Sequence, residues 1–434
     1  MLPLIRGGSL GAWPSKVRPN HTRAGTAVAV TAWGAFVNQF AAGQQSSQRP
    51  PGLEPHACAS PTRLSLDRLF GKDRTGAGFH ISAVGAGTRH AMIAAGIEGA
   101  CGPETAVAGF GLNRCYQLGN ADPEQATDGA GVISISGRAV QIACGREHSA
   151  MIVQQDSGSR KVMVCGSNAF GQLGRVRGDP RGMPTLHRSG IGELEALDGM
   201  LGSGEAPTKV QCGLDHTLVL TTKGRVFAMG WGADGQLGTG STMDSDKPVR
   251  VCGLEDAPVV DISSTTDFTL ALTADNRLLY WGNAEYGQCM VGRKIDKVLA
   301  PMQIPFDKGP IRSVAAGGTH AMLLTEDGRV YACGYGALGL GAGCVSALVP
   351  GLVRGLDRIG WLAASTDRCL AIDSSGRMYS WGLGNSMGRL GNGSVSENSL
   401  LPSMLDTSLG PIDSALVALG NDIAIIATHD QTLG

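Results

Sequence analysis

The chain has 434 residues, of which 65 are glycine, and its formal net charge is −1. This length exceeds a typical single core, so it predicts two to three domains or one repeat architecture. The nearly neutral charge gives no general reason to expect binding to nucleic acid or to an anionic membrane. Glycine is about twice as frequent as the usual share of roughly 7%, and it recurs within a motif, which favours the repeat.

The N-terminal segment is basic and contains no acidic residue. Its charged residues are Arg6, Lys16, Arg18 and Arg23, and the first acidic residue is Glu54. This composition predicts a mitochondrial transit peptide over residues 1–24, with a disordered tail as the alternative. Its removal would change the net charge from −1 to −5.

The cysteines do not indicate disulfides or a metal site. Eleven are scattered singly, without a Cys-x-x-Cys pair. Even counts or close spacing usually accompany disulfide frameworks and zinc sites, so we interpret these residues as reduced core thiols and expect no cofactor. No run of about 18 apolar residues occurs, so we expect no transmembrane segment.

Two signatures recur along the chain. The first is an entry turn, in which an aliphatic residue, two small residues and two variable residues precede a histidine and an apolar strand. Intact copies end at His90, His148, His216 and His320, and degenerate copies end at Phe268, Arg368 and Ile423. Their number is therefore seven.

The second signature is the exit of a β-hairpin, marked by glycine beside an aromatic or apolar residue. The copies are Trp33-Gly34, Phe110-Gly111, Cys165-Gly166, Trp231-Gly232, Trp281-Gly282, Tyr335-Gly336 and Trp381-Gly382. Polar turns such as Lys223-Gly224 separate the two signatures and suit tight hairpins.

A period of roughly 50 residues made of short strands predicts an all-β, seven-bladed β-propeller. The chain begins with an exit hairpin, residues 27–34, and ends with an entry turn and strand, residues 417–428. Pairing of these two half-blades would complete the seventh blade and remove exposed edges. An open solenoid with two half-repeats is the alternative.

Two segments interrupt the period within the single propeller predicted for residues 25–434. Residues 44–80 are interpreted as a surface connection. Residues 175–206 are interpreted as either a contact loop or a disordered insertion. The basic residues of the second segment are Arg175, Arg177, Arg181 and Arg188.

The motif TxxGRVxxxGxGxxGQLG with a preceding GxxH turn resembles the regulator of chromosome condensation repeat, which implies a seven-bladed propeller. The resemblance covers nearly all of residues 27–428. The segments 281–288 and 334–341, with Gly111-Leu112-Asn113, are most similar to the mitochondrial regulator-of-chromosome-condensation-like branch. The chain departs from the nuclear member because it lacks a basic tail, and from the plant ultraviolet receptor because most of its tryptophans occupy exits.

No enzyme signature is present: the sequence contains no phosphate-binding Gly-x-x-x-x-Gly-Lys-Ser/Thr loop, no Gly-x-Ser-x-Gly elbow and no His-Glu-x-x-His. The entry-turn histidines recur once per blade, so we expect them to pack separately and not to form a metal cluster. We therefore predict a protein that is not an enzyme in the ordinary sense.

The residue before each entry-turn histidine, or before its replacement, is acidic in five of seven copies. These acids are Glu147, Asp215, Asp267, Asp367 and Asp422, and the two exceptions are Arg89 and Thr319. Equivalent positions of all blades share one face, so a broken acidic ring is predicted there. Each acid could instead cap its own β-turn.

The resemblance implies that acidic side chains on this face engage a GTPase and release its nucleotide. Asp215 and Glu147 are the favoured residues because they lie in intact turns. The first hypothesis is therefore a guanine-nucleotide exchange factor for a small or dynamin-like mitochondrial GTPase in the matrix or at the inner membrane, acting as a monomer.

The alternative hypothesis is a non-catalytic scaffold for mitochondrial ribosome assembly or RNA metabolism. A net charge of −5 makes the body a poor electrostatic partner for RNA. RNA binding would therefore have to use a local patch such as Arg175 to Arg188, or proceed through assembly proteins.

Overall fold

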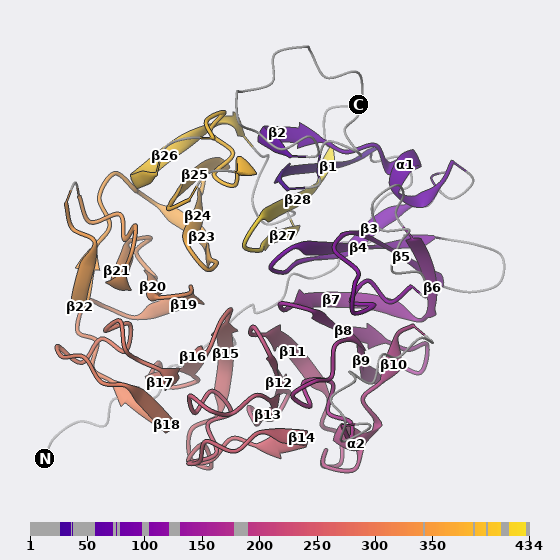
Figure 1. Cartoon of the computed structure of the whole chain (residues 1–434), viewed down its shortest axis with the longest axis horizontal. Coiled ribbons are helices and arrows are strands. Elements are labelled where there is room, and N and C mark those ends of the chain that lie inside the picture. Colours follow the sequence, from indigo (N-terminus) through magenta and orange to yellow (C-terminus); the bar gives the residue numbers. More distant parts are fainter. Residues whose placement is uncertain are drawn as a thin grey trace, which may run out of the picture.

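The computed structural model describes residues 27–35, 37, 57–72, 75, 79–97, 104–120, 131–177, 190–341, 343–384, 387–395, 398–408 and 416–430. These residues form seven four-stranded antiparallel sheets, arranged as blades around a central axis (Figure 1). The predicted all-β, seven-bladed propeller is confirmed.

Six blades are built from consecutive strands. Blade 1 contains β3 (His80–Ala86), β4 (His90–Ile97), β5 (Glu104–Gly111) and β6 (Gly131–Ser136). Blade 2 contains β7 (Arg138–Cys144), β8 (His148–Gln154), β9 (Arg160–Gly166) and β10 (Gly192–Glu193). Blade 3 contains β11 (Pro207–Cys212), β12 (His216–Thr221), β13 (Val226–Gly230) and β14 (Ser245–Arg250).

Blade 4 contains β15 (Val259–Ser264), β16 (Phe268–Thr273), β17 (Leu278–Asn283) and β18 (Lys297–Ile304). Blade 5 contains β19 (Ile311–Ala316), β20 (His320–Thr325), β21 (Val330–Tyr335) and β22 (Ser346–Leu352). Blade 6 contains β23 (Ile359–Ala364), β24 (Arg368–Asp373), β25 (Arg377–Gly382) and β26 (Ser399–Ser408).

Blade 7 joins the two ends of the described chain, as predicted. Its strands are β27 (Leu416–Leu419), β28 (Ile423–Asp430), β1 (Ala27–Gly34) and β2 (Cys58–Arg63), in that order from the axis outward. β1 pairs antiparallel with β28 along its whole length, with Ala27 opposite Asp430 and Gly34 opposite Ile423. This pairing closes the ring and excludes the open solenoid.

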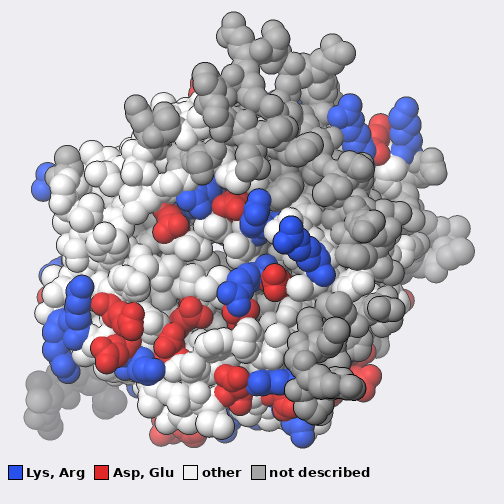
Figure 2. All heavy atoms as spheres, in the orientation of Figure 1, with Lys and Arg blue, Asp and Glu red and all other residues white. Residues whose placement is uncertain are grey.

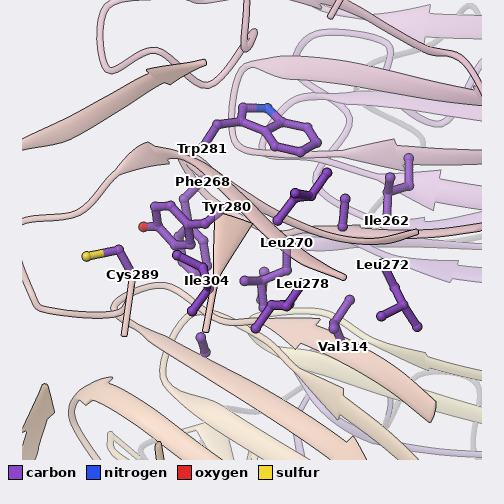
Figure 3. Packing of buried hydrophobic residues seen from close by; sticks show 14 of the residues in the cluster. Ile262, Phe268, Leu270, Leu272, Leu278, Tyr280, Trp281, Cys289, Ile304 and Val314 are labelled. Atoms are coloured by element: carbon purple, nitrogen blue, oxygen red, sulfur yellow. The ribbon is translucent and has the colours of Figure 1, made fainter. Parts of the chain in front are cut away.

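The blades pack face to face, which explains their burial pattern. The second strands β12, β16, β20 and β24 are buried at every position because both of their faces are covered. Figure 3 shows this packing around Trp281, where the rings of Phe268 and Tyr280 stack with centroids 5.3 Å apart. The turn after β12 contains Gly224 at φ 71°, which is the left-handed conformation expected for Lys223-Gly224.

Both interrupting segments contribute outer strands, so they are more than surface insertions. Residues 44–80 include β2 and also helix α1 (Leu66–Phe70), whose Leu69 and Phe70 are buried. Residues 175–206 include β10 and helix α2 (Glu195–Asp198), whose Leu197 is buried. Outer strands are only half buried, so their sequence pattern is too weak to mark them as strands. No helix of the described residues is long and apolar enough to span a membrane.

Outer strands present a free edge that could pair with another chain. Five of them contain a proline, which lacks the N–H needed to extend a sheet: Pro61, Pro248, Pro301, Pro350 and Pro402. These prolines therefore protect the rim of the propeller against strand addition.

Candidate functional site

The entry turns connect the first and second strands of each blade, and hydrogen bonds link every turn to the next around the axis. Backbone bonds make five links: Thr88 N–Gly145 O (3.1 Å), Arg146 N–Leu214 O (3.1 Å), Leu214 N–Thr266 O (3.3 Å), Gly318 N–Thr366 O (2.9 Å) and Asn421 N–Gly87 O (3.0 Å). Side chains make the other two: Thr266 Oγ1 donates to Gly318 O at 3.1 Å, and Arg368 Nη2 donates to Gly420 O at 2.8 Å. The entry turns are thus a continuous, rigid ring.

The residues before the second strands, here called the ring positions, are Arg89, Glu147, Asp215, Asp267, Thr319, Asp367 and Asp422. In every blade the carbonyl oxygen of the ring position accepts a hydrogen bond from the residue that follows the exit glycine. The donors, in the same order, are Leu112 (2.9 Å), Ser167 (2.8 Å), Trp231 (2.9 Å), Asn283 (2.8 Å), Tyr335 (2.9 Å), Leu383 (2.8 Å) and Ala35 (2.8 Å). The backbone of each ring position is therefore fixed in the same way.

The positions of the exit glycines explain the second sequence signature and show that two of its seven copies were assigned to the wrong glycine. They are Gly34, Gly111, Gly166, Gly230, Gly282, Gly334 and Gly382, and a Cβ on any of them would overlap the ring-position carbonyl oxygen. In blades 3 and 5 the exits predicted as Trp231-Gly232 and Tyr335-Gly336 are wrong by two residues. Both blades contain Gly-x-Gly, and pairing of Gly230 with His216 and of Gly334 with His320 identifies the first glycine of each as the equivalent one.

The side chains at the ring positions do not form a simple acidic ring, because arginines neutralise several of them. Arg146 forms an ion pair with the buried carboxylate of Asp215. Asp422 lies between Arg389 (3.3 Å) and Arg89 (3.6 Å). Each of these pairs joins two neighbouring blades, so these carboxylates help to hold the ring together.

The weakest of these contacts is made by Asp367, which lies 4.0 Å from Arg389. Thr319 donates from Oγ1 to Tyr335 O at 2.8 Å and contributes no charge. Figure 2 shows Lys, Arg, Asp and Glu side chains interspersed around the middle of the face in view. The predicted acidic face is therefore a face of mixed charge.

Asp267 differs from Asp215, Asp367 and Asp422. Among the described residues it forms no ion pair, and its only polar side-chain contact is a 3.4 Å hydrogen bond from Gln236 Nε2. Burial, together with the nearby negative charges of Asp234 and Asp215, raises the pKa of Asp267 to about 6. It is thus a carboxylate that would be stabilised by an incoming cation.

Glu147 also lacks an ion pair among the described residues, and it is exposed. Asp215 is 7% exposed and is covered by Arg146. Burial raises the pKa of Asp215, while Arg146 opposes that effect. Of the two favoured residues, only Glu147 is directly accessible.

Sequence reasoning missed Arg146 and Arg389. Arg146 stands immediately before the ring position of blade 2. Arg389 occupies the place of the buried glutamines Gln117, Gln172 and Gln236 in the Gln-Leu-Gly close. The altered close Gly-Arg-Leu-Gly of blade 6 was the signal that could have revealed Arg389.

The entry-turn histidines are buried and bond to the next blade, as separate packing groups. The Nε2 atoms contact Ser149 Oγ (from His90, 2.8 Å), Thr217 Oγ1 (from His148, 3.0 Å), Ser264 Oγ (from His216, 3.0 Å) and Cys369 Sγ (from His320, 3.1 Å). Burial lowers the pKa of all four, so they are neutral. Within the described part of the chain, no group of three or more His, Cys, Asp or Glu side chains could hold a metal ion.

The two basic residues of the segment 175–206 that the structure describes, Arg175 and Arg177, make contacts within the protein. Arg175 Nη2 donates to Glu193 O at 2.7 Å. Arg177 Nη2 donates to Phe170 O at 2.9 Å and pairs with Asp244 at 3.0 Å. Arg181 and Arg188 lie outside the described residues, so an RNA- or partner-binding role for these four arginines stays a prediction.

Comparisons with known proteins agree with this architecture. The human RCC1-like G exchanging factor-like protein is 30% identical over 380 residues, which cover 82% of this chain and 76% of that protein. The crystal structure of human WBSCR16 superposes with a TM-score of 0.76 at 26% identity, covering 93% of this chain and all of that one. Prp20p of Saccharomyces cerevisiae, at 20% identity and a TM-score of 0.70 over 94% of this chain and 92% of its own, shares the fold.

The model of the RCC1-like domain matches residues 107–426, which is well over half of the chain. The matched region contains six of the seven ring positions. The chain therefore belongs to the RCC1-like domain family.

Proposed function

We propose that this protein is a guanine-nucleotide exchange factor-like interaction protein that acts on a mitochondrial GTPase. The GTPase binds to the face formed by the entry turns. The human relative is named as an RCC1-like G exchanging factor-like protein, and the solved structure of Prp20p is described together with its binding properties to Gsp1p and histones. Both names support a GTPase as the class of partner.

An exchange factor needs no covalent chemistry of its own. It accelerates nucleotide release if it binds the nucleotide-free GTPase more tightly than the loaded one. Carboxylates can do this by pairing with the lysine that otherwise holds the nucleotide phosphates, or by competing for the magnesium ion. The propeller would therefore present a carboxylate that gains a partner only in the nucleotide-free complex.

The observation that carries the proposal is the uncompensated carboxylate of Asp267. Its backbone is fixed by the bond from Asn283, and burial, together with the nearby carboxylates of Asp234 and Asp215, disfavours its charged form, although Arg146 partly opposes this effect. A cation brought by the partner would lower the pKa of Asp267 and favour its charged form. The free energy released in this way is available only in the complex.

The test is the release of fluorescent GDP from purified mitochondrial GTPases. The wild-type protein should accelerate release from one of them, and Asp267→Asn should reduce that acceleration by about 30-fold, corresponding to about 2 kcal/mol for a buried charge pair. Asp307→Asn, which changes an 84% exposed carboxylate outside the ring, is the control and should match wild type. No acceleration of any candidate GTPase, or an Asp267→Asn variant as active as wild type, would reject the proposal.

The mitochondrial location rests on the first 24 residues. A version without residues 1–24 should remain outside mitochondria in import assays, whereas the full chain should enter and be shortened. Import that is unaffected by the deletion would contradict this part of the proposal.

A further inference from the structure

Two aromatic pairs bridge neighbouring blades beside the ring positions. The rings of Phe170 and Trp231 meet edge to face with centroids 4.3 Å apart, and those of Tyr286 and Tyr335 are 6.2 Å apart. In each pair the first residue precedes the Gly-Gln of the close, and the second follows the exit glycine of the next blade. Tyr286 and Tyr335 are 39% and 47% exposed, so the second pair is accessible to a partner.

The position between the two pairs is acidic. Asp234 precedes Gly-Gln in blade 3, as Phe170 does in blade 2 and Tyr286 in blade 4. The negative charges of Asp234 and Asp215 both act on Asp267, although Lys297 lies 3.7 Å from Asp234 and Arg146 pairs with Asp215. The order around the face is therefore aromatic pair, carboxylates, aromatic pair.

Beside the first pair, the side-chain nitrogen of a buried glutamine has no hydrogen-bond partner among the described residues. Gln172 is 1% exposed, and its Oε1 accepts a hydrogen bond from Phe170 N at 2.8 Å. Its Nε2 has no hydrogen-bond partner among the described residues. The equivalent glutamines use this atom: Gln236 donates to Asp267 Oδ1, and Gln288 donates to Asn283 O at 3.1 Å.

We propose that these two aromatic pairs, together with Gln172, anchor a segment of a protein partner that carries lysine or arginine side chains. The inference deepens the proposed function because it names the chemistry of the partner segment and the residues that select it. Cations are attracted both by the carboxylates and by the faces of the flanking aromatic rings. The Nε2 group of Gln172, which is buried in the free protein, donates to a backbone carbonyl of the docked segment.

The opposite side of the ring is less favourable for a segment of this kind. There Arg389 and Arg89 already hold Asp422, and Arg389 lies beside Asp367. A basic segment is repelled by these arginines, whereas it is attracted by Asp267 of blade 4, which forms no ion pair among the described residues. The partner therefore docks in one rotational orientation.

The inference can be tested without a GTPase, on the full-length protein labelled with 5-fluorotryptophan. The fluorine resonance of Trp231, assigned by comparison with Trp231→Phe, is followed during titration with tetralysine at low ionic strength. Tetralysine should shift this resonance saturably, and tetraglutamate should not. Tyr335→Ala and Asp267→Asn should each weaken tetralysine binding about fivefold.

Met404→Ala is the matched control, because Met404 is also strongly exposed but lies on the outer strand of blade 6. It should bind tetralysine as wild type does. An absent shift, an equal response to tetraglutamate or unchanged binding by Tyr335→Ala would overturn the inference. Tetralysine binding without acceleration of GDP release would reject the proposed function alone.

Discussion

The exit glycines should be required for more than their backbone conformation, and Gly282 provides the sharpest test. Gly282 has φ 103°, and a Cβ there would overlap Asp267 O and lie 2.6 Å from Phe268 Cα. Gly253 has φ 68°, with nothing within 4 Å of its would-be Cβ. Gly282→Ala and Gly253→Ala therefore share a positive φ and differ in the collision.

The magnitudes follow from this difference. A positive φ costs alanine about 1–2 kcal/mol, and the reduced freedom of the unfolded chain returns about 0.4–1 kcal/mol. Gly253→Ala should thus lower the free energy of unfolding by about 1 kcal/mol. Gly282→Ala adds about 2 kcal/mol for displacing packed backbone, because neither Asp267 nor Phe268 can move without breaking the ring.

Urea unfolding followed by tryptophan fluorescence measures both effects. With a slope of about 3 kcal/mol per M, the unfolding midpoint should fall by about 1 M for Gly282→Ala and by about 0.3 M for Gly253→Ala. Equal shifts for the two variants would refute the reasoning that the exit glycine is selected by the ring-position carbonyl. The same Gly282→Ala protein should lose exchange activity, since it displaces Asp267.

Two further predictions concern the ring itself. Burial lowers the pKa of His90 and His216 to about 3 and of His148 and His320 to about 4, so the unfolded chain takes up protons near pH 6.5 that the folded chain does not. The free energy of unfolding should therefore fall as the pH decreases from about 6.5 to about 4. In His148→Gln the urea midpoint should fall less steeply with decreasing pH than in wild type. Equal slopes for the variant and wild type would contradict this reasoning. Arg368→Met should lower the free energy of unfolding by about 2 kcal/mol, because it removes the hydrogen bonds to Gly420 O and leaves that buried carbonyl without them. A thermal midpoint equal to that of wild type would show that the link between Arg368 and Gly420 is dispensable.

The fold could be predicted from the sequence because its signatures reflect contacts repeated in every blade. Gly282 has an equivalent in every blade, because each blade needs the same close approach of exit and entry turn, and His216 has an equivalent in three others. The outer strands β2 and β10 could not be predicted in this way, because each pairs with a neighbour on one side only and has little hydrophobic pattern. Two glycines in Gly230-Trp231-Gly232 also left the exit register ambiguous until strand pairing resolved it.

The candidate site was predictable in position but not in charge. The ring positions could be located by counting from the histidines. Whether a carboxylate there is neutralised depends on residues from other blades, such as Arg146 for Asp215 and Arg389 for Asp422. Asp267 was not favoured by its sequence because its entry turn lacks both glycine and histidine.

The backbone at the ring positions is the same in every blade while the side chains vary, which supports the proposal that this face binds the partner. Because the exit glycine and the following N–H hold every ring-position carbonyl alike, replacing a ring side chain alters the surface without altering the blade. Ion pairs then use some of these side chains as links between blades, as at Asp215 and Asp422. Asp267 forms no such link among the described residues, and burial, together with Asp234 and Asp215 and against the effect of Arg146, raises its pKa to about 6. This residue fits the proposed binding of a cationic partner, because the charge of the partner would favour the ionised carboxylate.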